Sequence, residues 1–238
     1  MTSAEYLGAG AAATVAGCVL PATLTAAMAR SVLARLPNGA TLPAGPVEAV
    51  TAACVMVVAA RYVTGALPGE WLPVVVPLTV LAVPLALVDL RERRLPDPLT
   101  LAACAAIGCG IGYAAVASGQ PELLAGAAAG ACLYGGAHLV VHLARPRSLG
   151  AGDVKLAVSL GAVLGALGPS ALLLAGVLAP LVTVVLALVT VVSGAVTAPR
   201  PAPRSYRGRW PGDGIPHGPG LLLATWVLAI APSEGLLR

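Results

Sequence analysis

Apolar runs long enough to cross a lipid bilayer follow one another along almost the whole chain. Short segments rich in charge, glycine or proline separate these runs, and a transmembrane helix needs about 20 apolar residues. The composition agrees, since 58% of the 238 residues are hydrophobic and only 10% are charged, far from the usual soluble range. The sequence therefore predicts an all-α, polytopic integral membrane bundle of about eight transmembrane helices, near residues 5–29, 46–66, 71–90, 98–117, 121–143, 154–168, 170–196 and 218–232.

The segments between these runs leave no room for a large soluble domain. We therefore expect residues 1–238 to form a single membrane unit. The N-terminal run has no basic segment before it and is longer than the apolar region of a signal peptide, so we expect it to remain as a membrane span.

The distribution of basic residues predicts how the chain is oriented. If the N-terminus lies outside, twelve of the fourteen Lys and Arg residues fall in inside loops, and only Arg61 and Arg238 fall outside. The positive-inside rule expects this asymmetry. The formal charge of +4 then reflects orientation in the bilayer, and we expect no nucleic-acid partner.

Two groups of potential metal ligands have simpler explanations. The five cysteines all lie inside apolar runs and form no C-x-x-C pair, so we interpret them as small packing residues rather than a zinc or disulfide framework. His138 and His142 are spaced i, i+4 and could offer two ligands on one helix face, but no H-E-x-x-H pattern is present. Hydrogen bonding inside the bundle is the favoured interpretation, and we expect no metal or other cofactor.

Four aspartates fall at the predicted inside edge of the membrane, where ionisable groups are candidates for function. Asp97 precedes Pro98 and a helical run, which predicts an N-cap followed by proline at the first helical position. Asp213 lies in a loop rich in Pro, Gly and Arg and is expected to be solvated or paired with arginine. Asp153 begins the sixth run and could also act only as an N-cap.

Asp89 is harder to explain structurally, because it ends the third apolar run. The C-terminus of a helix disfavours an anion, although Arg91, Arg93 and Arg94 could compensate. Asp89 and Asp153 are expected to meet at one membrane level. Two neighbouring carboxylates that share a proton can activate water and polarise a peptide carbonyl, which is the chemistry of aspartyl proteases.

The stretches "VDLRERRLPDPLT" and "GAGDVKL" resemble those of the prepilin peptidases (type IV leader peptidases), membrane aspartyl proteases of the G-x-G-D type. The resemblance implies that Asp89 and Asp153 are the catalytic pair and that Gly150 and Gly152 form the G-x-G, with Lys155 and Asp97 as substrate-binding or motif-supporting residues. The segment "IPHGPGLLLATW" resembles the family's last motif, with His217 where Phe is usual, and Glu48 matches an acidic position between the first two spans.

One feature departs from that family. Many bacterial members carry two C-x-x-C pairs in the first cytosolic loop together with an N-methyltransferase activity, but this loop has no cysteine. We therefore expect a degenerate N-terminal region over residues 1–66, a protease core over residues 71–238, and no bound metal. Whether methylation occurs stays open.

The resemblance implies an endopeptidase that cleaves the leader of type IV prepilin-like or pseudopilin substrates, which carry a basic leader and an apolar helix. Cleavage is expected at the cytosolic face of the plasma (inner) membrane, with the lipid bilayer as the other partner. The alternatives are a transporter or proton relay that uses Asp89 and Asp153, and an inactive scaffold of a pilus or secretion machine. The oligomeric state stays open, as do the roles of Lys155, His138, His142 and His217.

The helix positions suggest how the two acids divide their roles. Asp153 at a helix N-terminus has its anion stabilised, whereas Asp89 at a C-terminus has its anion destabilised. We therefore expect Asp153 to be the base and Asp89 to hold the proton, although the nearby arginines could reverse this assignment.

Overall fold

The computed structural model describes residues 17, 21–35, 42–92, 95–145, 149–192 and 216–231. Within these ranges the regular structure is helical throughout, as the sequence predicts. A helix over residues 21–35 is followed by α2 (Pro46–Val63), the short 3₁₀ helix η1 (Gly69–Trp71), α3 (Leu72–Glu92), α4 (Asp97–Ser118), α5 (Glu122–Ala144), α6 (Ala151–Leu167), α7 (Pro169–Val192) and α8 (Gly218–Ile230).

Five of the described helices are long and apolar enough to cross a membrane. They are α2, α3 with η1, α4, α5 and α7. Two more, α6 with 17 residues and α8 with 13, are apolar but shorter. Seven of the eight predicted spans thus coincide with helices, and the first lies largely outside the described residues. A hydrocarbon core of about 30 Å accommodates such short helices where packed neighbours cover their ends.

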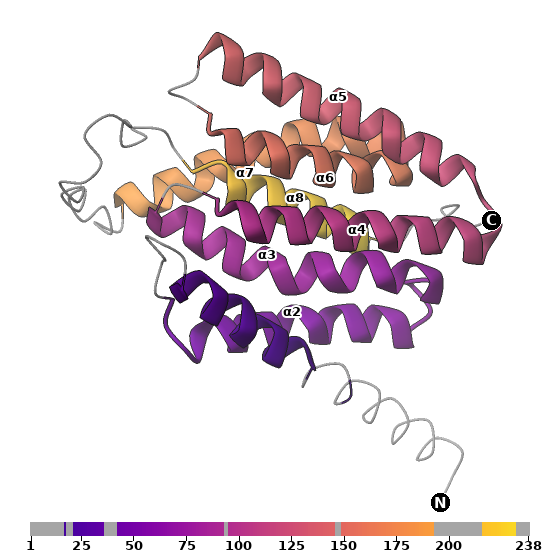
Figure 1. The fold of residues 1–238 in the computed structure, drawn as a ribbon, viewed down its shortest axis with the longest axis horizontal. Coiled ribbons are helices and arrows are strands. Elements are labelled where there is room, and N and C mark those ends of the chain that lie inside the picture. The colour runs from indigo at the N-terminus through magenta and orange to yellow at the C-terminus, as the bar shows by residue number, and fades with distance from the viewer. Residues whose placement is uncertain are drawn as a thin grey trace, which may run out of the picture.

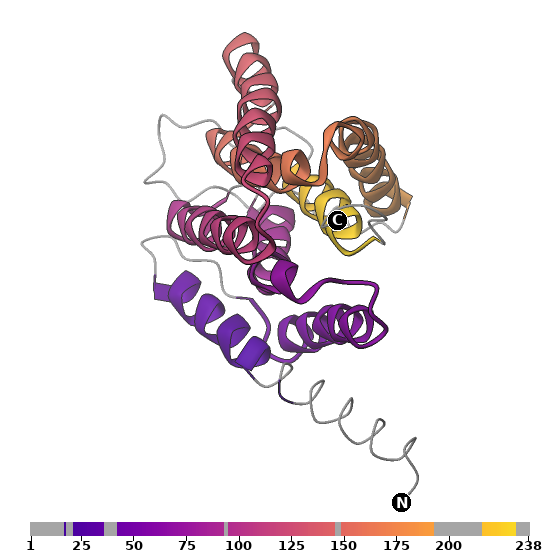
Figure 2. The ribbon, with the colours of Figure 1, turned by 90° about the vertical axis from the view of Figure 1, so that its right-hand side faces the viewer.

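The helices run alternately in opposite directions along one bundle (Figure 1). Seen along the helices in Figure 2, the helix over residues 21–35 and α2 lie on one side, α5 to α8 lie on the other, and α3 and α4 lie between them. The C-termini of α3, α5 and α7 and the N-termini of α4, α6 and α8 all lie at the same end of the bundle (Figure 1).

Helix α6 lies inside the bundle and contacts α4, α5, α7 and α8. Its contact with α5 is built on glycines. A Cβ atom added to Gly165 would lie 2.7 Å from the Cα atom of Gly130, and one added to Gly126 would lie 2.6 Å from the carbonyl oxygen of Gly165. The two backbones therefore touch, as small residues permit between membrane helices. The outer faces of α5 and α7 expose leucine and valine side chains, as expected for a surface in contact with lipid.

The N-terminal helix differs from the prediction in its end point. The first apolar run was expected to end at residue 29, but the helix continues to residue 35 and carries Arg30 and Arg35. The Nε atom of Arg30 lies 3.1 Å from the Oε1 atom of Glu48. The second oxygen of Glu48 accepts a hydrogen bond from the backbone N–H of Gly45 at 2.7 Å. Arginine is a good helix former, and this ion pair ties its helix to the start of α2.

Candidate active site

Asp89 lies in the last turn of α3 and is only 3% exposed. Its Oδ2 atom accepts a hydrogen bond of 2.9 Å from the backbone N–H of Gly218, the first residue of α8. The first N–H groups of a helix have no partner within the helix and carry its positive pole. The N-terminus of α8 thus donates a hydrogen bond to the buried acid. The C-terminus of α3 cannot do so, because its unpaired backbone groups are carbonyl oxygens.

The close approach of Asp89 to Gly218 is possible because glycine has no side chain. A Cβ atom at this position would lie 2.7 Å from the Oδ2 atom of Asp89 and 3.1 Å from its Cγ atom. Any side chain here would push the carboxylate away from the N–H that holds it. The conformation of Gly218 is ordinary helix, so the requirement for glycine comes from the close approach of Asp89.

Asp153 lies in the first turn of α6 and is 9% exposed. It occupies the third helical position, and its Oδ2 atom accepts a hydrogen bond of 3.2 Å from the backbone N–H of the N-cap residue Gly150. This is half of a capping box, since glycine has no side chain to return the bond. The Oδ1 atom of Asp153 is buried and has no hydrogen-bond partner among the described residues. Capping therefore accounts for one oxygen of this carboxylate and not for the other.

The structure brings these two carboxylates together at one end of the bundle. Helix α8 contacts both α3 and α6, and Asp153 is close enough to Asp89 for their charges to interact. Two histidines also interact electrostatically with Asp153, His217 from the N-cap of α8 and His138 from α5. The result is a polar cluster, surrounded by apolar helices, whose ionisable members come from four different helices.

The two glycines of the G-x-G sequence have different neighbours. A Cβ atom on Gly152 would lie 2.9 Å from the Cβ atom of Leu95, in the segment that leads from α3 to α4. A Cβ atom on Gly150 would lie 3.4 Å from the Oδ2 atom of Asp153, which is ordinary contact. Gly152 therefore lets the segment after Asp89 approach α6 closely, whereas Gly150 supplies the backbone N–H that holds Asp153.

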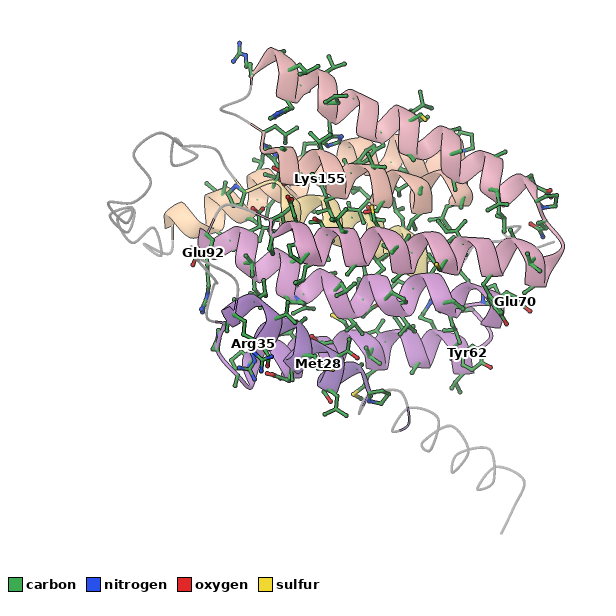
Figure 3. All side chains as sticks on the ribbon, in the orientation of Figure 1. Met28, Arg35, Tyr62, Glu70, Glu92 and Lys155 are labelled. Carbon is green, nitrogen blue, oxygen red and sulfur yellow. The ribbon has the colours of Figure 1, made fainter. Side chains whose placement is uncertain are left out.

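Lys155 and Asp97 form an ion pair of 2.7 Å between the Nζ and Oδ1 atoms. The predicted N-cap role of Asp97 is wrong. Pro96 is the N-cap of α4, Asp97 is the first helical residue, and no side chain caps this helix. The carboxylate instead reaches Lys155 on α6, because tertiary packing supplies a cationic partner that local sequence rules cannot foresee. Figure 3 shows Lys155 at the same end of the bundle as Glu92, with Tyr62 and Glu70 at the opposite end.

The remaining polar residues singled out in the sequence have mostly local partners. The Nδ1 atoms of His138 and His142 each lie 2.7 Å from a backbone carbonyl oxygen, that of Tyr134 and that of Leu149. This confirms the predicted hydrogen-bonding role of both histidines. Cys54, Cys104, Cys109 and Cys132 are free thiols on the spanning helices. Arg91 is exposed while Asp89 is buried, and Asp213, Arg93 and Arg94 lie outside the described residues.

A sequence model of the type IV leader peptidase family matches residues 74–192, half of the chain. The chain belongs to this family. The matched region contains both buried aspartates, the G-x-G sequence and the Asp97–Lys155 pair. No curated protein and no solved structure matches the chain. Membership implies a protease, and the apolar helices indicate a multi-pass protein of the membrane.

The sequence around His217 resembles a family motif, but it does not reveal what this segment contributes to the site of this leader peptidase. The backbone N–H of Gly218 donates a hydrogen bond to Asp89, and the imidazole of His217 interacts electrostatically with Asp153. Both residues lie at the start of α8, outside the region that the family model matches. A glycine next to proline at the start of an apolar run was the available signal, since such a residue marks a helix N-terminus with free N–H groups.

Proposed function

We propose that this leader peptidase is an aspartyl endopeptidase that uses Asp89 and Asp153 as its catalytic pair. One observation carries the proposal. The two acids lie together in the region that matches the family, are both buried, and are each held at one oxygen by a backbone N–H. The second oxygen of Asp153 is buried without a partner among the described residues and is therefore available for chemistry.

The geometry supports a division of labour between the two acids. The Oδ1 atom of Asp153 is buried without a partner among the described residues, and the N-terminus of α6 stabilises its anion. This atom accepts a proton from the attacking water. Asp89 holds the shared proton on its Oδ1 atom, the oxygen that does not face Gly218, and donates a hydrogen bond to the carbonyl oxygen of the scissile peptide. In an apolar surrounding, two such close acids do not both ionise.

The proposed substrates are type IV prepilin-like or pseudopilin proteins with a basic leader and an apolar helix. Their apolar helix lies in the bilayer beside the bundle, and the leader is cut at the cytosolic face. The excess of lysines and arginines in the segments that the sequence predicts to be inside loops supports this orientation. The protease core comprises residues 71–238, preceded by a region, residues 1–66, without the C-x-x-C pairs. Membership of a protease family favours this function over the transporter and proton-relay alternative.

The test is cleavage of a co-expressed prepilin-like substrate, followed by the change in size on leader removal. Asp89→Asn and Asp153→Asn keep the shape of each side chain but remove the acid. Each is expected to reduce the rate by about a thousandfold or more, because each carboxylate has a separate role. Glu122→Gln, which neutralises an exposed acid at the opposite end of the bundle, is the matched control and should cleave normally. Normal processing by Asp89→Asn would refute the aspartyl mechanism.

A further inference from the structure

The ion pair between Asp97 and Lys155 joins two helices that are separated by 58 residues of sequence. Both side chains are substantially exposed, Lys155 to 45% and Asp97 to 60%. Exposed ion pairs contribute little to stability. The position of this pair, next to both segments that carry the aspartates, therefore needs an explanation other than stability.

Asp97 begins the helix that follows Asp89 in the chain, and Lys155 lies two residues after Asp153. Residues two apart on a helix point to nearly opposite sides. Asp153 accordingly faces the buried cluster while Lys155 faces α4. The ion pair thus attaches to α4 the face of α6 that is opposite to Asp153.

Two further contacts join α4 and the segment before it to the same turn of α6. Leu95 packs so closely on Gly152 that a Cβ atom on this glycine would lie 2.9 Å from the Cβ atom of Leu95. The Sγ atom of Cys104 lies 3.9 Å from the carbonyl oxygen of Lys155. These contacts fix how closely the helices approach, and the ion pair adds a directional contact that limits how α6 can rotate about its axis.

Lys155 is not explained by the helix in which it lies. The N-terminal end of α6 favours anions over cations, so its dipole gives Lys155 no stabilisation. The carboxylate of Asp97 lies in the first turn of α4, where the helix dipole favours an acid, but it caps no backbone group there. The contact that both charges share is the one across the helix interface.

We propose that Asp97 and Lys155 are positioning residues, which set the rotation of the first turns of α6 and so aim the free oxygen of Asp153 at the substrate and at Asp89. This inference rests on the proposed aspartyl protease function. Loss of the pair leaves the protein folded and able to bind substrate, but turns Asp153 away from its reactive position.

The test is a charge-reversal cycle measured on the full chain in detergent, with a prepilin-like substrate. Asp97→Lys and Lys155→Asp should each lower kcat about tenfold or more while KM changes little, because misplacing a reacting group affects the rate of the chemical step. The double variant Asp97→Lys with Lys155→Asp restores the pair in reverse and should recover kcat to within about threefold of wild type. Lys155→Arg keeps the charge and should retain activity.

Glu92→Lys is the matched control, because it makes the same change of charge at the same end of the bundle on an exposed side chain. It should leave kcat unchanged, and thermal unfolding should confirm that every variant is folded. Wild-type kcat in both single variants, an equal loss in Glu92→Lys, or no recovery in a folded double variant would each overturn the inference. Wild-type protein that cleaves nothing, or Asp89→Asn protein that cleaves normally, would overturn the proposed function instead.

Discussion

The contact between Gly218 and Asp89 predicts that a single methyl group should disable the enzyme. In Gly218→Ala the new Cβ atom would lie 2.7 Å from the Oδ2 atom of Asp89, whereas ordinary contact begins at 3.4 Å. The carboxylate must therefore retreat by about 0.7 Å, and its 2.9 Å hydrogen bond to the backbone N–H lengthens or breaks. The carboxylate is the end of the Asp89 side chain, so it will move before the helices do.

The expected effect follows from these distances. A hydrogen bond within a protein contributes about 0.5–1.5 kcal/mol, and misplacing a reacting group by about 1 Å can reduce the rate about a hundredfold. We therefore expect Gly218→Ala to reduce kcat by one to two orders of magnitude, about 10- to 100-fold. The protein should remain folded, because alanine is a better helix former than glycine.

The assay is the initial rate of leader removal by purified protein in detergent, with folding checked by thermal unfolding. Gly176→Ala is the matched control, because a Cβ atom at Gly176 in α7 has no neighbour within 4 Å. This variant should cleave at the wild-type rate. A Gly218→Ala protein that cleaves as fast as wild type would show that the backbone N–H of Gly218 does not orient Asp89, and the reasoning about this contact would fail.

Four further predictions concern other parts of the structure. His217→Phe should retain cleavage, because the backbone of the next residue and not the imidazole holds Asp89; complete loss of cleavage would assign the imidazole an essential role. Gly165→Ala should lower the free energy of unfolding by about 1–3 kcal/mol, because its Cβ atom would overlap the backbone carbonyl oxygen of Gly126 in α5; unchanged unfolding would contradict this close packing. A cysteine that replaces Glu92 in a cysteine-free background should be shielded from an impermeant thiol reagent outside intact cells, and one that replaces Glu122 should react; the reverse pattern would place the site outside. EDTA should leave cleavage unchanged, since a water activated by two carboxylates needs no metal; inhibition that zinc reverses would contradict this chemistry.

The sequence was sufficient to predict the class of the fold and most of its helices. Apolar runs of the length of a bilayer indicate membrane helices because the hydrocarbon core forces every backbone polar group to pair within its own segment. This constraint is local, so α3, α4 and α5 begin and end within two residues of the predicted runs. The predicted end of the first helix at residue 29 is wrong, because arginine continues a helix readily and both Arg30 and Arg35 lie within the helix.

The sequence also identified the two aspartates, because an acid at the C-terminus of an apolar helix is unfavourable without a partner. What it could not supply were those partners. Gly218 lies 129 residues from Asp89, and Lys155 lies 58 residues from Asp97. The N-cap prediction for Asp97 failed for the same reason, since a local capping rule competes with a cation that another helix brings within reach.

The sequence by itself therefore determined that this chain is a helical membrane protein with two acids at one end of its spans. Solvent and local backbone chemistry dictate those properties, residue by residue. Only the tertiary structure decided which N–H groups hold the acids, which oxygen of Asp153 has no partner among the described residues, and which charge faces Asp97. Those choices depend on how closely glycines let the helices approach and on how each helix is rotated about its axis, which are properties of the packed bundle and not of any one segment.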